Sequence, residues 1–131
     1  MSDDVCVFVV DDEALILLTL EHALEDGGFE HRTAMSGEEA NRLFSECGEK
    51  CRALVTDVNL GGDLTGWDVA RSARERFPNL PVVYVTGDSA HEWAAHGVPN
   101  SILVGKPFVA AQIVNAVATL LNAGPAPPTG D

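Results

Sequence analysis

Residues 5–13 read Val-Cys-Val-Phe-Val-Val-Asp-Asp-Glu, an unbroken apolar run that ends in three acids. Six consecutive apolar residues, most of them β-branched, are typical of a strand buried on both faces of a sheet. Leucines at helical spacing follow, and this pattern stops at Gly27-Gly28, a common helix end. The stretch therefore predicts a buried strand, an acidic turn and then a helix.

The same alternation of a short β-rich run with a longer helical run recurs four times along the chain. Ser36 and Glu39 have the spacing of a capping box at the start of the second helix. Because helical crossovers join parallel strands, the pattern predicts an α/β fold, a (βα)5 doubly wound sheet of five parallel strands with helices on both faces. The later strands are expected at residues 29–33, 53–56, 82–85 and 102–104, a short helix at 89–95 and the last helix at 109–121.

The 131 residues leave room for one domain, predicted over residues 1–122 and followed by a flexible Pro/Gly-rich tail over residues 123–131. Hydrophobic residues make up 46% of the chain, which argues against the intrinsically disordered class. The net charge is -12, from 20 acidic and 8 basic residues, so a phosphate-rich partner would be repelled. Direct binding to nucleic acid or to an anionic membrane is therefore not expected.

No apolar run approaches the roughly 20 residues that a membrane span requires, and the first residues do not resemble a secretory signal. The three cysteines, Cys6, Cys47 and Cys51, are odd in number, which fits reduced thiols. A metal or redox pair of Cys47 and Cys51 is the alternative to ordinary packing, but no second ligand pair accompanies it. A cytoplasmic protein is expected.

Chemically active side chains follow four of the predicted strands. Asp11 and Asp12 follow the first strand, and Asp57 follows the third. Thr86 follows the fourth strand and Lys106 the fifth. The carboxyl ends of the strands share one rim in a doubly wound sheet, and such folds bind their ligands there. Three adjacent carboxylates favour a hard cation such as Mg²⁺, and the lysine adds a positive charge, so the rim predicts a site for a cation and an anion such as a phosphoryl group.

Simpler interpretations stand beside this one. Asp11 and Asp12 could cap the first helix, and Lys106 could be a solvated surface lysine. Trp67 and Trp93 are expected to pack or to contact a partner. No glycine-rich phosphate loop of a nucleotide-binding protein is present. No chemical role is expected for the histidines, which are His22, His31, His91 and His96.

Four motifs together carry a family resemblance. Taken in order at the ends of the predicted strands, they make residues 5–121 similar to the receiver domain of two-component response regulators. The resemblance implies a flavodoxin-like fold with the strand order 2-1-3-4-5. The motifs are Val10-Asp11-Asp12-Glu13, Val55-Thr56-Asp57-Val58-Asn59-Leu60, Val85-Thr86-Gly87 and Gly105-Lys106-Pro107-Phe108.

The resemblance implies that Asp57 is the phosphoacceptor, whose carboxylate attacks the phosphohistidine of a histidine kinase or histidine phosphotransfer protein. Thr86 and Lys106 would each contact a phosphoryl oxygen, and in the family a cis peptide commonly precedes the position of Pro107. Mg²⁺, or Mn²⁺ in its place, would neutralise charge on the transferred group. Its implied ligands are the carboxylates of Asp12 and Asp57, Asp11 mainly through water, and the backbone carbonyl of Asn59.

The resemblance further implies a stand-alone bacterial receiver that changes its surface on phosphorylation and binds a downstream protein target. Hydrolysis of the acyl phosphate would be slow self-catalysis, so no enzyme with a separate substrate is expected. A homodimer is implied either through the face of the short helix, the fifth strand and the last helix, or through the first and last helices.

Three alternatives remain open at this stage. The chain is a fragment of a hybrid kinase or larger regulator, or it is a pseudo-receiver that binds partners without phosphorylation. An aspartyl-phosphate phosphatase is the third, but its nucleophile usually belongs to an Asp-x-Asp pair, which Asp11-Asp12 does not provide.

Two positions depart from the family pattern. Leu103 stands where receivers usually carry an aromatic residue that couples phosphorylation to the output face. We hypothesise that Tyr84 or Phe108 takes over part of this coupling. Gly61 replaces the usual proline after the phosphoacceptor, so a more flexible loop is expected there.

Overall fold

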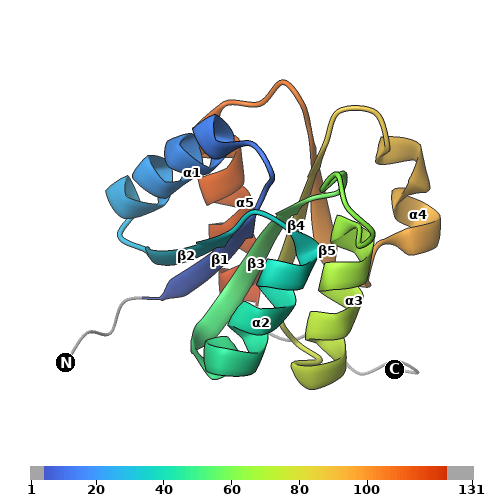
Figure 1. The fold of residues 1–131 in the computed structure, drawn as a ribbon. Helices are drawn as coiled ribbons and strands as arrows, with labels where there is room; N and C mark the ends of the chain where they lie inside the picture. The colour runs from blue at the N-terminus through green and yellow to red at the C-terminus, as the bar shows by residue number, and fades with distance from the viewer. Residues whose placement is uncertain (1–4, 124–131) are drawn as a thin grey trace, which may run out of the picture.

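A sheet of five parallel strands lies at the centre of the computed structural model, which describes residues 5–123 (Figure 1). The strand order is 2-1-3-4-5 and all neighbouring strands pair in parallel. The fold class and strand order expected from the sequence are confirmed. The strands are β1 (Cys6–Val10), β2 (Glu30–Ala34), β3 (Cys51–Asp57), β4 (Val82–Thr86) and β5 (Ser101–Gly105).

Helices cover both faces of this sheet, as the crossovers require. In Figure 1 the first and last helices lie on one side of the strands, and the second, third and fourth lie on the other. The helices are α1 (Ala14–Asp26), α2 (Gly37–Cys47), α3 (Gly66–Arg76), α4 (Trp93–His96) and α5 (Ala110–Ala123), with 3-10 turns η1 (Gly48–Lys50) and η2 (Ala90–Glu92).

The core consists of two layers, one on each face of the sheet. All residues of β1 are buried, and alternate side chains enter opposite layers. Phe8 and Val10 pack toward α2 and α3, whereas Val7 and Val9 pack toward α1 and α5. This is the burial on two faces that the apolar run predicts. Because both layers are packed, the strand ends are held in fixed positions relative to one another.

The starts of α2 and α3 differ from the capping expected. Ser36 accepts a hydrogen bond from the Glu39 amide at 3.0 Å, but the Glu39 carboxylate accepts from Met35 rather than from Ser36. Only half of the predicted capping box is therefore present. A complete box, which the sequence analysis missed, joins Thr65 and Asp68 at the start of α3. It ends the glycine-rich loop at a defined residue.

The last helix differs slightly from its predicted range. It begins at Ala110 and runs to Ala123, two residues past the expected end at Leu121. Leu120 and Leu121 are partly buried against the core, which favours continuing the helix through this turn. Ala123 is thus helical, and the other residues of the predicted tail, 124–131, lie outside the described residues.

The three cysteines are free thiols. Burial raises the pKa of Cys6 and raises that of Cys51 to about 12, so neither forms the reactive thiolate readily. These features agree with ordinary packing rather than with a redox pair. Across residues 5–123, the structure contains no helix with the length and apolar character to cross a bilayer.

Candidate functional site

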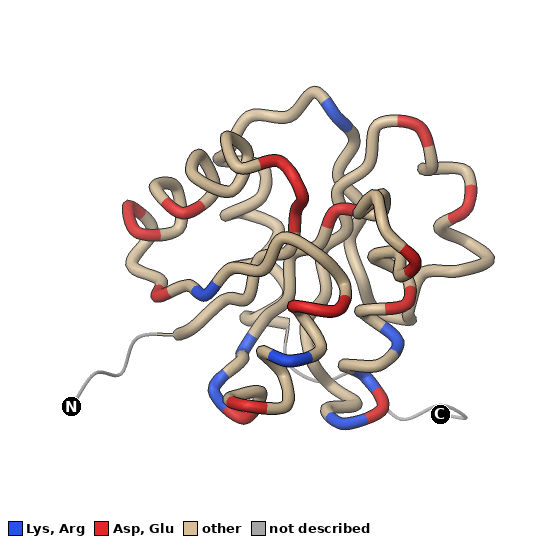
Figure 2. The backbone as a smooth tube through the Cα atoms, viewed as in Figure 1, with Lys and Arg blue, Asp and Glu red and all other residues tan. Residues whose placement is uncertain are grey.

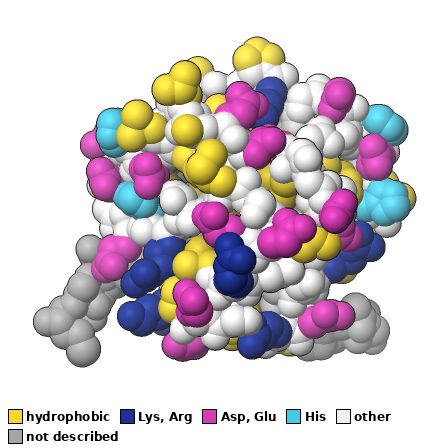
Figure 3. Space-filling model, viewed as in Figure 1, with side chains coloured by type: hydrophobic (Ala, Val, Ile, Leu, Met, Phe, Trp, Pro, Cys, Tyr) yellow, Lys and Arg dark blue, Asp and Glu magenta, His cyan; other side chains and the backbone are white. Residues whose placement is uncertain are grey.

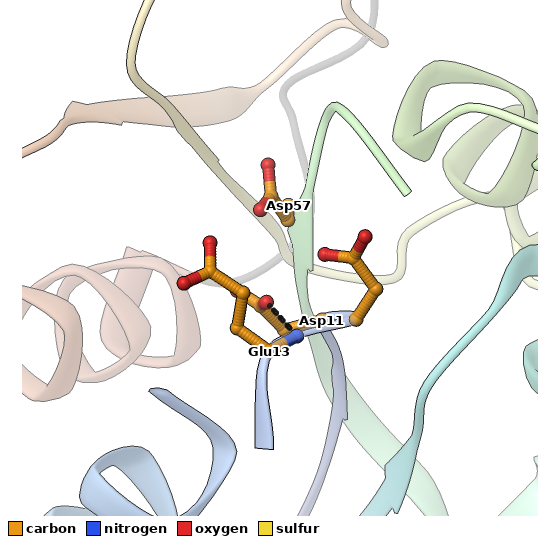
Figure 4. Close-up of side chains that lie close together, drawn as sticks. Asp11, Glu13 and Asp57 are labelled. Carbon is orange, nitrogen blue, oxygen red and sulfur yellow. Dashed lines mark hydrogen bonds between the residues drawn. The ribbon is translucent and has the colours of Figure 1, made fainter. Parts of the chain in front are cut away.

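Four acids converge where β1 and β3 end. Asp11, Asp12 and Glu13 follow β1, and Asp57 is the last residue of β3. One carboxylate oxygen from each lies within 4.8 Å of the others. Asp11 and Asp57 are buried at 2% and 4% exposure, whereas the other two are exposed. Figure 2 places acidic positions at these strand ends, and Figure 4 shows Asp11, Glu13 and Asp57 beside one another.

Glu13 is a member of this cluster that the sequence analysis did not assign. It precedes the first residue of α1 but makes no capping hydrogen bond with its side chain. Its amide donates to the Asp11 carboxylate at 2.8 Å, so that carboxylate orders the turn rather than capping the amides of α1 (Figure 4). The signal for Glu13 was the third acid of the Asp-Asp-Glu run.

Asp57 is held by hydrogen bonds at both carboxylate oxygens. The Asn59 amide donates to Oδ1 at 3.0 Å, and Lys106 Nζ donates to Oδ2 at 2.9 Å. Lys106 Nζ also lies 3.7 Å from Glu13 Oε1. The amide of Lys106 donates to the Thr86 carbonyl at 2.8 Å, and the Lys106-Pro107 peptide is cis, as the resemblance implied. Both neighbours on Asp57 come from loops beyond strand ends.

The electrostatics of the site are dominated by negative charge. Burial raises the pKa of Asp11 from 3.8 to about 6; the hydrogen bond from Glu13 opposes this rise, and the charge of Asp57 adds to it. Burial alone would lower the pKa of Lys106, but its hydrogen bond with Asp57 and the nearby acids outweigh burial, so this pKa is raised. One ammonium thus faces four acids, and the cluster favours a further cation.

The donor set fits a hard divalent cation. Carboxylate oxygens are the ligands that Mg²⁺ and Mn²⁺ prefer, and here four approach one another while Lys106 contacts two of them, those of Asp57 and Glu13. Asp11, Asp12 and Asp57, predicted as ligands, all belong to the cluster. The role of the Asn59 backbone carbonyl stays a prediction.

Thr86 lies at the end of β4, one residue past the register partner of Asp57, which is Val85. Thr86 is buried, and its Oγ1 accepts a hydrogen bond from the Ser89 amide at 3.0 Å. This bond orders the first turn after β4. The threonine is therefore beside the acid cluster in the sheet, with its hydroxyl oxygen engaged by its own loop.

Two glycines make room for the acids. Gly61 has a φ of 72°, which favours glycine, and a Cβ there would lie 3.0 Å from Asp12 Oδ2. At Gly66 a Cβ would overlap the carbonyl oxygen of Asp57. The Gly66 amide donates to the Val58 carbonyl at 2.8 Å, which holds the start of α3 against the end of β3.

The histidines lie outside the acid cluster. His31 contacts Glu25 at 2.9 Å and Glu21 at 3.5 Å, on the α1 and β2 side of the domain. His91 and His96 each lie 3.9 Å from Glu92. These contacts lie outside the acid cluster, and the absence of a chemical role for the histidines stays a prediction.

The residues around Leu103 lie on the α3 and α4 side of the sheet. Leu103 is the register partner of Tyr84, and both pack in the same core layer. Tyr84 is fully buried, packs against Trp67 with ring centroids 4.6 Å apart and ring planes tilted by 58°, and accepts a hydrogen bond from the Val98 amide at 3.1 Å. Phe108 packs in the opposite layer. Of the two hypothesised substitutes for the aromatic residue, only Tyr84 shares a core layer with Leu103.

A doubly wound sheet with this strand order, and with acids and a lysine meeting at its carboxyl rim, defines a receiver-like α/β domain. The family model of the response regulator receiver domain matches residues 7–118. The chain belongs to this family.

Solved structures agree with the assignment. A response regulator receiver protein from Sinorhizobium medicae WSM419 is 44% identical, with a TM-score of 0.88, and the match covers 92% of this chain and 97% of that one. A receiver domain protein from Clostridium thermocellum is 27% identical, with a TM-score of 0.82, over 90% and 94% of the two chains.

Curated relatives are longer than this chain. The response regulator receiver protein Anae109_2439 of Anaeromyxobacter is 40% identical over 111 residues, which cover 85% of this chain and 43% of that protein. The transcriptional regulatory protein PrrA of Mycobacterium tuberculosis is 36% identical over 88% of this chain and 49% of its own length. The chain therefore spans about half the length of these relatives.

Proposed function

We propose that Asp57 accepts a phosphoryl group from a phosphohistidine on a histidine kinase or histidine phosphotransfer protein. The observation that carries the proposal is the buried Asp57 carboxylate, which Lys106 contacts at 2.9 Å inside a cluster of four acids. An Asp57 oxygen attacks phosphorus, a P–O bond forms and the P–N bond breaks. The electron pair of that bond stays on the imidazole nitrogen, and Asp57 carries an acyl phosphate.

The surrounding residues stabilise the charge of the transferred group. Lys106 turns from the carboxylate to a phosphoryl oxygen, and Thr86 donates its hydroxyl proton in a hydrogen bond to another. The Asn59 amide keeps the other Asp57 oxygen in place. A divalent cation, when bound by Asp11, Asp12 and Asp57, neutralises charge on the phosphoryl group.

The phosphodonor protein docks, in this proposal, on the α1 side of the site. A groove of about 530 Å³ is lined by Lys106 together with Ile16 and Phe108. Leu15 and Leu18 of α1 are 79% and 48% exposed, and Figure 3 shows hydrophobic side chains over this part of the face. An exposed apolar surface that adjoins Lys106, the lysine in contact with the phosphoacceptor, suits a partner that must bring its phosphohistidine to Asp57.

The acyl phosphate then acts as a switch. Its contacts with Lys106 and Thr86 favour one of two arrangements of the loops and of the surface that a downstream protein binds. Water hydrolyses the acyl phosphate slowly in the same site and resets the switch. On this account the chain is a cytoplasmic phosphoprotein rather than an enzyme with a separate substrate.

A second candidate is that the chain acts as the receiver part of a longer protein. The lengths of its relatives favour this reading, since the sensor kinase CckA of Brucella abortus matches this chain over only 13% of its own length. The output or kinase activity would then belong to other parts of that protein, and the chemistry at Asp57 would be the same.

The test is phosphorylation by a small donor. Incubation with Mg²⁺ and phosphoramidate is expected to add the mass of one phosphoryl group, which is stable in acid and lost in base. Asp57→Asn or a chelator should abolish the adduct, and Asp63→Asn, which alters an exposed acid of the loop after β3, should retain it. An adduct that persists in Asp57→Asn contradicts the proposal. No adduct in the parent would favour the pseudo-receiver.

A further inference from the structure

A side-chain hydrogen bond joins the two loops that follow β3 and β4. Asn59 Nδ2 donates to Asp88 Oδ1 at 3.1 Å, across 29 positions of sequence. The backbone of the same residue donates to Asp57 Oδ1 at 3.0 Å. Asn59 therefore connects the phosphoacceptor, through its own backbone and side chain, to the loop that carries Thr86.

Asp88 continues this connection to Thr86. The Ser89 hydroxyl donates to Asp88 Oδ1 at 3.4 Å, and the Ser89 amide donates to Thr86 Oγ1 at 3.0 Å. Ser89 and Thr86 are buried, whereas Asn59 and Asp88 are exposed. A chain of hydrogen bonds thus runs from Asp57 to the Thr86 hydroxyl. Its exposed link is the Asp88 carboxylate, which accepts from both Asn59 and Ser89.

We propose that Asp88 is a positioning residue whose hydrogen bond with Asn59 holds the two loops together in the resting state. This hydrogen bond is called the latch below. With the latch closed, Ser89 stays against the Thr86 hydroxyl, which must be free to turn when a phosphoryl group arrives. The proposal rests on the function proposed for Asp57. Because a single exposed hydrogen bond contributes little, the latch tunes the rate of phosphoryl uptake rather than permitting or forbidding it. Loss of the latch should raise that rate by about two- to tenfold.

The test compares variants on each side of the hydrogen bond. Asp88→Ala and Asn59→Ala each remove the latch, and the second leaves the backbone bond to Asp57 intact. Both should take up phosphoryl groups from phosphoramidate with Mg²⁺ faster than the parent, and the double variant should be no faster than either single variant. Asp88→Asn keeps a carbonyl oxygen in place of Oδ1 and should restore the parent rate. Asp63→Ala is the matched control, and thermal melting verifies that each variant folds.

The outcomes separate the latch from the function beneath it. If Asp88→Asn accelerates uptake as much as Asp88→Ala, the charge of Asp88 matters and the latch is wrong. Equal rates in all variants, or additive effects in the double variant, also overturn the latch while Asp57 remains a phosphoacceptor. Absence of an adduct in the parent overturns the proposed function itself.

Discussion

Gly66 begins α3 at a point where the helix meets the end of β3. A Cβ there would overlap the Asp57 carbonyl oxygen, and backbone atoms cannot move aside as a flexible side chain can. Gly66→Ala should therefore lower the free energy of unfolding by about 2 kcal/mol or more. Gly105→Ala is the control, because a Cβ at Gly105 meets open space. Equal urea midpoints for the two variants would contradict this account of Gly66.

Asp11 makes stability depend on pH in the metal-free protein. Its pKa is raised from 3.8 to about 6, mainly by burial, so the folded state binds its proton more tightly than the unfolded state. The parent should lose stability as the pH rises from about 4 to about 6. Asp11→Asn keeps an acceptor for the Glu13 amide without the charge. The free energy of unfolding of this variant should exceed that of the parent by about 1–3 kcal/mol above pH 6 and match it below pH 4.

Urea unfolding of the parent and of Asp11→Asn at pH 3.5 and pH 7.5, in buffer that contains a chelator, measures this difference in the free energy of unfolding. Mg²⁺ at pH 7.5 should reduce it, because the cation stabilises the parent's ionised carboxylates and binds the variant less well. A variant that is no more stable than the parent at pH 7.5, or that is stabilised equally by Mg²⁺, would be inconsistent with the placement of Asp11 in the cation site.

Among the elements, β4 connects the site to the α4 region. Tyr84 is buried in this strand, and its hydroxyl oxygen accepts the Val98 amide beyond α4. Tyr84→Phe removes only the hydroxyl, leaving the Val98 amide without that acceptor, and should lower the free energy of unfolding by about 1–2 kcal/mol.

Tyr84 is also the hypothesised substitute for the aromatic residue that Leu103 replaces. If it couples phosphorylation to the α4 region, the NMR signals of the Val98 amide and the Trp93 indole should shift less in Tyr84→Phe than in the parent when a phosphoryl analogue is added. Phe108→Ala should shift like the parent, and an unchanged response in Tyr84→Phe would remove Tyr84 from the switch.

The exposed face of α1 is the surface on which the phosphodonor protein is proposed to dock. Leu15→Ala with Leu18→Ala should slow phosphoryl transfer from a histidine kinase several-fold but leave labelling by phosphoramidate unchanged, since neither leucine is buried. Met35→Ala, which alters a comparably exposed apolar residue after β2, is the control. Equal transfer rates from the kinase to the parent and to the double variant would place the docking surface elsewhere.

The elements were predicted most accurately where only one structural environment can bury their apolar residues. The apolar runs of β1 and β4 can be buried only inside a covered parallel sheet, and both strands are fully buried. Boundaries set by local hydrogen bonds were harder to predict. Glu39 selects the Met35 amide instead of Ser36, and the Thr65 cap of α3 lies within a glycine-rich loop that reads as irregular. Such choices depend on loop paths that periodicity does not describe.

In the site, too, the residues at strand ends were easier to predict than the contacts that depend on the loops. Asp11, Asp57 and Lys106 were predictable because each lies at the end of a strand or directly after it, and parallel strands end at one rim. The place of Glu13 in the cluster and the bond between Asn59 and Asp88 depend on how the loops turn after the strands. No spacing in the sequence encodes a contact between positions 59 and 88.

At the scale of the whole molecule, the acid cluster lies at the carboxyl rim of the sheet, and several basic residues lie at the opposite end. Lys50 and Arg52 are at the start of β3 and Arg74 and Arg76 at the end of α3, where acids are interspersed with them (Figure 2). The net charge of -12 is thus concentrated partly where a cation would bind. The homodimer through α4, β5 and α5, or through α1 and α5, stays a prediction.

In the proposed function one carboxylate, that of Asp57, carries the phosphoryl group. The most direct measurement reduces the acyl phosphate with borohydride to an alcohol and maps the tryptic peptides by mass spectrometry. Cleavage after Arg52 and Arg71 gives a peptide that also contains Asp63 and Asp68, so fragmentation identifies the modified residue. Reduction is expected at position 57 alone, and only when Mg²⁺ was present during labelling. Reduction at Asp11, Asp12 or any other acid, with Asp57 unmodified, would contradict the proposed function.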